Sequence, residues 1–146
     1  MAARNLMRHF GGARLLALLL GVIAPVPSFA AHWIYIGKSS DSADRIMLDT
    51  DSLKKDGQFT FVDILTVYAT PRMNSYDITM DRFMQRTAFD CKGHTFVAVE
   101  TIGYLQGKRV GTSHATVDWK DETVPIPSDP LSDRIYAAVC TPAAQR

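Results

Sequence analysis

The sequence contains only two cysteines, Cys91 and Cys140, and no Cys-x-x-Cys pair. This argues against a redox or metal centre built on closely spaced thiols, including one at Cys91-Lys92-Gly93-His94. Long apolar runs are also missing. The uncharged stretch from Leu15 to Ala24 is about half of the ~20 residues that a membrane-spanning helix needs, so we expect no permanent membrane anchor.

Motifs for metal binding are incomplete. Asp49-Thr50-Asp51 resembles the start of a calcium loop, but its fifth position, an oxygen ligand, is Leu53; its sixth, a glycine, is Lys54; and its twelfth, a bidentate glutamate, is Thr60. Three histidines share no ligand spacing with one another: His32, His94 and His114. We therefore expect no cofactor and no metal.

A catalytic nucleophile is not recognisable either. Ser113-His114 lacks a recognisable nucleophile elbow, and the nearby Asp118 indicates nothing about triad geometry. We expect a protein that is not an enzyme. A small enzyme or metal-dependent protein that uses His94, His114 and nearby acids stays open as the alternative.

The charge balance excludes one class of partner. The full chain has 16 Lys and Arg residues and 15 Asp and Glu residues. Without residues 1–30, the basic residues number 13 and the acidic residues still 15, so the net charge is −2. A nearly neutral surface gives no electrostatic footprint for nucleic acid, so we expect no nucleic-acid binding.

The first thirty residues have the order of a secretory signal peptide. Arg4, Arg8 and Arg14 precede the apolar run without any acid, and Ser28 and Ala30 are the small residues before a cut. We expect cleavage between Ala30 and Ala31 and a periplasmic, secreted or cell-surface protein. In such an oxidising compartment, one pair of thiols is expected to close into the disulfide Cys91–Cys140.

Residues 31–146 form one domain of the common size, and most of it is typical of strands. We expect strands at 33–36, 45–49, 58–68, 79–91, 94–105 and 108–117, from runs of β-branched and aromatic residues. Residues 50–55 are expected to turn before the reversal at Asp56-Gly57, and residues 71–78 to form a loop. The turn at Lys92-Gly93 predicts an antiparallel hairpin between its neighbouring strands.

The end of the chain predicts a helix. Pro125 and Pro127 cannot lie inside a sheet, since proline donates no hydrogen bond to the ladder. Ser128 or Asp129 can cap a helix in which Leu131, Ile135, Ala138 and Val139 form an apolar stripe. We expect this stripe to pack on the sheet, where a Cys91–Cys140 bond would hold it.

These pieces together resemble the surface-adhesin protein E family. The resemblance runs from about Trp33 to Cys140 and rests on Met47-Leu48-Asp49 followed by Ser52-Leu53-Lys54-Lys55-Asp56-Gly57, Phe89-Asp90-Cys91, Trp119, the two prolines, and Ala138-Val139-Cys140. It implies an α+β fold: one antiparallel sheet of about six strands packed against a C-terminal helix, with the cysteines bonded. Its namesake is a bacterial surface adhesin that binds host matrix and serum proteins and can dimerise.

Two departures bear on the function. Asp63 stands where the family often has a tryptophan, and no lipid-anchor cysteine follows the signal. We expect an exported, non-enzymatic binding domain with a matrix or envelope protein as partner, in contact with an exposed sheet face or edge, and able to form a homodimer. A structural envelope subunit is a further alternative. Some residues have both a packing and a binding interpretation: Lys54-Lys55, Lys108-Arg109, Trp33, Tyr35, Tyr104 and Trp119.

Overall fold

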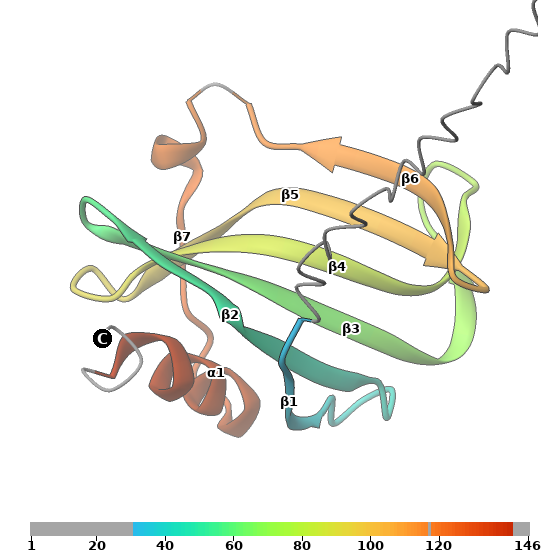
Figure 1. Cartoon of the computed structure of the whole chain (residues 1–146), viewed down its shortest axis with the longest axis horizontal. Helices are drawn as coiled ribbons and strands as arrows, with labels where there is room; N and C mark the ends of the chain where they lie inside the picture. Colours follow the sequence, from blue (N-terminus) through green and yellow to red (C-terminus); the bar gives the residue numbers. More distant parts are fainter. Residues whose placement is uncertain (1–30, 117, 142–146) are drawn as a thin grey trace, which may run out of the picture.

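A computed structural model describes residues 31–116 and 118–141 of the chain. Its six long strands form a single antiparallel sheet: β1 (Trp33–Lys38), β2 (Arg45–Asp56), β3 (Phe59–Met73), β4 (Thr79–Asp90), β5 (Thr95–Leu105) and β6 (Lys108–His114). Each strand lies beside its neighbour in the sequence, as Figure 1 shows. The expected sheet, including the hairpin of β4 and β5, is confirmed.

The chain then crosses to the other side of the sheet. A short 3₁₀ helix, η1 (Trp119–Glu122), precedes a two-residue strand, β7 (Val124–Pro125), which pairs with the start of β5. The C-terminal helix α1 (Pro130–Cys140) follows and lies against one end of the sheet (Figure 1). Within the described ranges, every helix is too short or too polar to cross a membrane. The expected α+β architecture is confirmed, with β7 as an addition.

Two expected breaks between strands are wrong. Residues 50–55 do not turn, because β2 continues to Asp56 after a break in its register with β3 between Asp49 and Lys54. The Ser52 hydroxyl bridges this break: it donates to the Asp49 carbonyl at 2.7 Å and accepts the Asp63 N–H at 2.8 Å. A side chain thus replaces the missing rungs of the ladder.

The second wrong expectation concerns residues 71–78. Strand β3 continues to Met73, and only residues 74–78 connect it to β4. Pro71 lies in a register shift between Val67 and Arg72, where the ladder requires no donor from it. Strand β6 is also shorter than expected, because it ends at His114 while Val117 lies outside the described residues.

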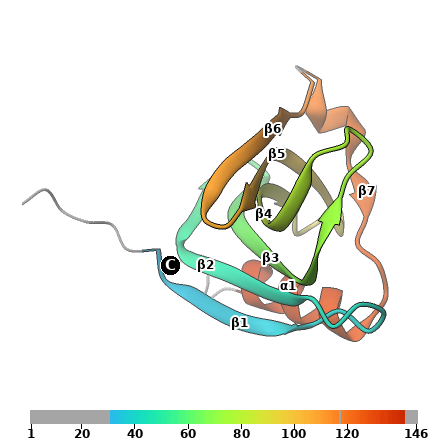
Figure 2. The same ribbon diagram turned by 90° about the vertical axis from the view of Figure 1, so that its right-hand side faces the viewer.

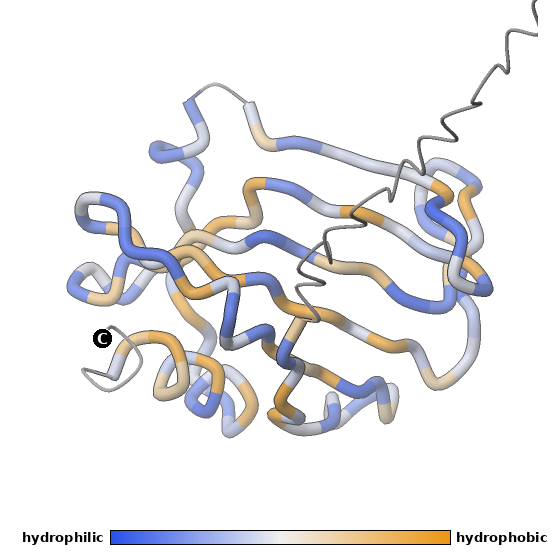
Figure 3. Tube along the Cα trace, in the orientation of Figure 1, coloured by the Kyte–Doolittle hydropathy of each residue, from blue (hydrophilic) through white to orange (hydrophobic). Residues whose placement is uncertain are grey.

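The sheet has two faces of different character. We call the side that carries α1 the helix face and the opposite side the open face. The main core lies on the helix face, between sheet and helix: Ile46, Leu48, Val62, Ile64, Phe89, Ile126 and Val139. The sheet is strongly curled (Figure 2). The alternation of apolar and polar residues along the strands, visible in Figure 3, separates the two faces.

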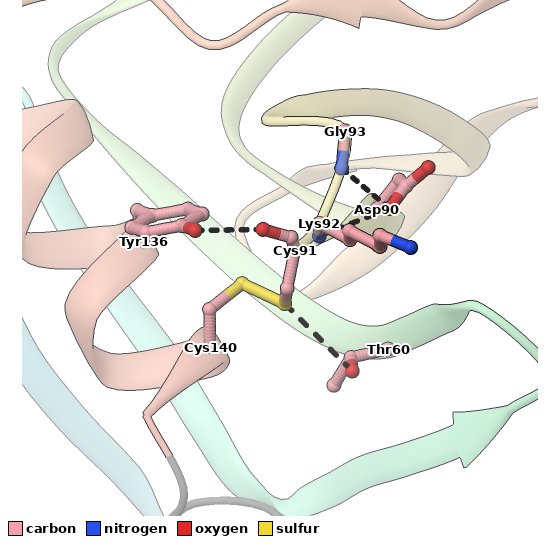
Figure 4. The surroundings of a disulfide bond; sticks show 7 residues. All are labelled: Thr60, Asp90, Cys91, Lys92, Gly93, Tyr136 and Cys140. Carbon is pink, nitrogen blue, oxygen red and sulfur yellow. Dashed lines mark hydrogen bonds between the residues drawn. A yellow bond between two sulfur atoms is a disulfide. The ribbon is translucent and has the colours of Figure 1, made fainter.

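The beginning and the end of α1 are both fixed. Asp129 caps the helix, since its Oδ1 accepts the N–H groups of Leu131 at 2.9 Å and Ser132 at 3.0 Å. A hydrogen bond from the Ser132 hydroxyl, together with these two N–H groups, holds the pKa of Asp129 below its ordinary value. The other end carries the disulfide between Cys140 and Cys91, whose Cα atoms are 5.5 Å apart. Figure 4 shows the Tyr136 hydroxyl donating to the Cys91 carbonyl at 2.8 Å.

A buried carboxylate connects the loop after β1 with the end of β3. Asp44 is 4% exposed and accepts the Ser42 hydroxyl at 2.6 Å, the Ala69 N–H at 2.9 Å and the Arg72 guanidinium at 2.8 Å. Arg72 in turn lies 4.7 Å from the centre of the Tyr68 ring. Burial acts to raise the pKa of Asp44, but these donors and the positive charge outweigh it and hold that pKa below its ordinary value.

Asp44→Asn is expected to lower the free energy of unfolding by about 2 kcal/mol at pH 7, because an amide is a weaker acceptor for these donors. A lowered folded-state pKa stabilises the protein above the unfolded value of about 4, and this contribution is lost as the pH falls through the folded value. Urea unfolding at pH 7 and pH 3 should therefore show the difference from wild type shrinking at pH 3. The exposed Asp41→Asn in the same loop is the control; an equal difference at both pH values would contradict the assignment.

Candidate binding surface on the open face

An apolar row crosses the open face from edge to edge. Its members are opposite one another in the register of five successive strands: Tyr35, Met47, Leu65, Met84 and Ile102. Tyr35 is 56% exposed, the next three are half-buried and Ile102 is buried. Cross-strand partners on one face touch, so the row is continuous. The row is thus a partly buried apolar strip whose exposed end is Tyr35.

A charged row runs beside the apolar row. It consists of residues that are again opposite one another: Asp49, Asp63, Arg86, Glu100 and His114. Arg86 makes two bonds to Asp63, at 2.9 and 3.0 Å, and His114 Nδ1 lies 3.5 Å from Glu100. Hydrogen bonding to Asp63 raises the pKa of Arg86 against the effect of burial, and the Glu100 charge adds to the rise.

On the other side of the apolar row lies a basic row. Arg45, Arg82 and Arg109 alternate in register with Val67 and Tyr104. Arg82 pairs with Asp81 at 2.9 Å, and the Arg109 guanidinium donates to the Thr112 hydroxyl. The open face thus presents an apolar centre between two polar margins. Protein interfaces have this anatomy, with Met, aromatic residues and Arg enriched in them.

One end of the open face is covered. The Trp119 ring packs edge-on against Phe59 and Phe61, at 5.0 and 5.8 Å between ring centres. With Ala88 and Val97 they form a second, smaller core. In residues 31–116 and 118–141, this is the core cluster on the open face, while α1 packs on the other side. Of the two interpretations of Trp119, packing and binding, the structure supports packing. The three rows do not include any residue of this second core.

The structure disperses the three histidines. His94 packs 4.5 Å from the Tyr136 ring beside the disulfide, His114 faces Glu100 on the open face, and His32 precedes β1. Among the described residues, no group of three His, Cys, Asp or Glu side chains could hold a metal ion. Ser113 and His114 are adjacent on a strand, so their side chains point to opposite faces and cannot form a nucleophile–base pair.

The calcium-like segment also has a structural role. Asp49 Oδ1 accepts the N–H groups of His32 and Asp51, each at 3.0 Å. This carboxylate fixes the start of the break in β2. Of the basic pairs, Lys54-Lys55 lies at the end of β2 and Lys108-Arg109 at the start of β6. Only Arg109 of these four belongs to the three rows.

Sequence reasoning named Tyr35 and Tyr104 as candidate residues, but it missed the rows to which they belong. The sequence indicates the rows only within single strands, because residues two apart in a strand lie on the same face. Arg45, Met47 and Asp49 form one such triplet, and Asp63, Leu65 and Val67 form another. The alignment of these triplets requires the register of the strands. The proposed cleavage site before Ala31 cannot be placed, since Ala30 lies outside the described residues.

Comparison with known proteins gives one match. The family model described as surface-adhesin protein E matches residues 33–141, which include every strand and helix of the structure. Comparisons with curated proteins and with solved structures found no match. The match covers most of the chain and agrees with the resemblance in sequence order. The chain belongs to the surface-adhesin protein E family.

Proposed function

We propose that this protein is an exported, non-enzymatic adhesion domain that binds a protein partner on the open face of its sheet. The observation that carries the proposal is the apolar row, which crosses five strands between a charged and a basic row. Family membership supports the adhesin role. The N-terminal pattern of residues 1–30 supports export with cleavage before Ala31.

The chemistry of the face favours a folded protein as partner. The centre of the row offers methionine and leucine side chains for burial, and Tyr35 supplies an exposed aromatic ring next to them. The arginines at the margins can pair with carboxylates on the partner. We infer that the partner is an extracellular matrix protein or an envelope protein with an apolar patch and an acidic rim.

The two exposed tyrosines provide a matched test. Tyr35→Ala is expected to weaken binding of the partner at least tenfold, because tyrosine is among the residues that most often dominate the affinity of an interface, and Tyr35 is the exposed aromatic residue of the row. Tyr76→Ala is the control, because Tyr76 is 79% exposed but belongs to the turn between β3 and β4, outside the three rows. Binding of the exported protein to immobilised matrix proteins and to separated envelope proteins, followed by surface plasmon resonance, measures both variants.

Leu65→Asp provides a stronger perturbation at the centre of the row. A buried, unpaired carboxylate at an interface is costly, and we expect a loss of about 30-fold or more in affinity. Circular dichroism of the variant should match wild type, since Leu65 faces away from the main core. Equal affinities for wild type, Tyr35→Ala and Leu65→Asp would contradict the open face as the contact surface. A stable assembly without any bound partner would instead favour the structural-subunit alternative.

A further inference from the structure

A cavity of about 190 Å³ lies on the helix face, between the sheet and the chain leading into α1. Its walls are mainly apolar and include Phe89 and Phe96, whose rings stack at 5.9 Å between centres. Ile126 and Pro127 close it on one side, and Leu131 and Ile135 of α1 on another. An engineered apolar cavity of about 150 Å³ is known to bind benzene, so this space suffices for a molecule with one ring.

Polar groups lie on the floor of this cavity. Thr66 is 9% exposed and Thr87 only 3%, and both line the space together with Gln85. In the described part of the chain, neither threonine hydroxyl has a hydrogen-bond partner in the protein, whereas the Gln85 amide donates to the Thr101 hydroxyl at 3.4 Å. Every buried side-chain nitrogen or oxygen atom among the described residues has a hydrogen-bond partner, so these two hydroxyls are not sealed off but open onto the cavity. A molecule in the cavity can therefore form hydrogen bonds with both of them.

The lining also limits the charge of what enters. All twelve residues that surround the cavity are uncharged. Asp129, the cap of α1, is already engaged by the helix N-terminus and the Ser132 hydroxyl, and the exposed Asp133 and Arg134 of α1 do not line the cavity. An ion placed there would lose its hydration without a counter-charge, which is strongly unfavourable. The site therefore fits a neutral molecule.

We propose that the helix-face cavity is a binding site for a small neutral molecule: one ring, or an aliphatic chain of equal volume, with a hydroxyl or carbonyl group bonded to Thr66 and Thr87. The apolar part contacts Phe89, Phe96 and Ile135. The site is on the opposite side of the sheet from the three rows, so this inference does not rest on the proposed adhesion function. It gives the domain a second, chemically different ligand.

Benzyl alcohol is a suitable probe, with benzene and benzoate as comparators. The full chain, expressed for export, labelled with ¹⁵N and purified, should bind benzyl alcohol with a dissociation constant of about 1 mM or tighter. The amide signals of Thr66, Thr87 and Ile135 should move in two-dimensional NMR spectra. Benzene should bind more weakly, and benzoate should cause no saturable change because the cavity offers no counter-charge.

Thr87→Val and Thr66→Val remove one hydroxyl each at almost constant volume. Either variant should weaken benzyl alcohol binding about fivefold to tenfold and leave benzene binding unchanged or slightly stronger. Thr79→Val is the matched control, because Thr79 is an exposed threonine at the start of β4, the strand that also contains Thr87. Three results would each overturn the proposal: no saturable binding of benzyl alcohol up to its solubility, signal changes confined to the open face, or wild-type affinity in both valine variants. None of them affects the adhesion proposal.

Discussion

Replacing Cys91 and Cys140 together by serine is expected to lower the free energy of unfolding by about 4 kcal/mol. The disulfide closes a loop with a sequence separation of 49 residues, and the chain-entropy model assigns about this amount to such a loop. For a domain of this size the melting temperature should fall by about 15 °C. The effect is large because this bond joins the end of β4 to the last residue of α1.

Equilibrium unfolding in urea measures the change, and Tyr136→Phe is the matched control. That substitution removes the hydrogen bond to the Cys91 carbonyl but leaves the disulfide in place, so it should destabilise by only about 1 kcal/mol. Intact mass under non-reducing conditions shows whether both thiols are oxidised, and it also tests the expected cleavage before Ala31. Two free thiols in exported protein, or equal losses in the two variants, would refute this account of the disulfide.

Leu48→Ala is expected to destabilise the protein by about 3 kcal/mol. Leu48 is fully buried in the main core on the helix face. Removing its branched end loses transfer free energy and leaves a cavity. Thermal and urea unfolding should both report the loss.

Leu65→Ala makes the same chemical change on the neighbouring strand, but on the open face. It should cost about 1 kcal/mol or less, since Leu65 is only partly buried. The contrast between the two variants tests which face carries the core. Similar losses would mean that the apolar row is part of a core and not a surface for binding.

Much of the fold could be predicted from the sequence, because its signals are local. The β-branched runs, Gly57 and the cap expected at Ser128 or Asp129 each act within a few residues; the structure confirms the positive φ of Gly57 and selects Asp129 as the cap. The continuation of β2 could not be predicted, since it depends on the Ser52 hydroxyl meeting the N–H of Asp63 from another strand. The loop expected from Pro71 onward was wrong for a similar reason. Whether a proline interrupts a strand depends on whether the neighbouring strand needs a backbone N–H from that position, and this cannot be read from the sequence.

The candidate site was less accessible to sequence reasoning. The apolar row exists only because five strands have one particular register, and a slip of one residue in any strand would turn its member to the other face. Tyr35 and Ile102 are opposite ends of the row, yet no local pattern connects them. Thr66 and Thr87 likewise look like ordinary strand residues until the structure places them beside the same cavity.

The strand order also allows the sheet to assemble progressively from its N-terminal strand. Each long strand pairs with its predecessor, so the hairpins can form one after another as the chain emerges from its N-terminal end. The helix face stays uncovered until the final segment arrives, when Arg134 reaches the Ile36 carbonyl from 98 residues away. Until that moment the nascent sheet exposes its main apolar surface and is most prone to aggregate. A chaperone that protects this protein would therefore act after β6 has emerged and before α1 docks.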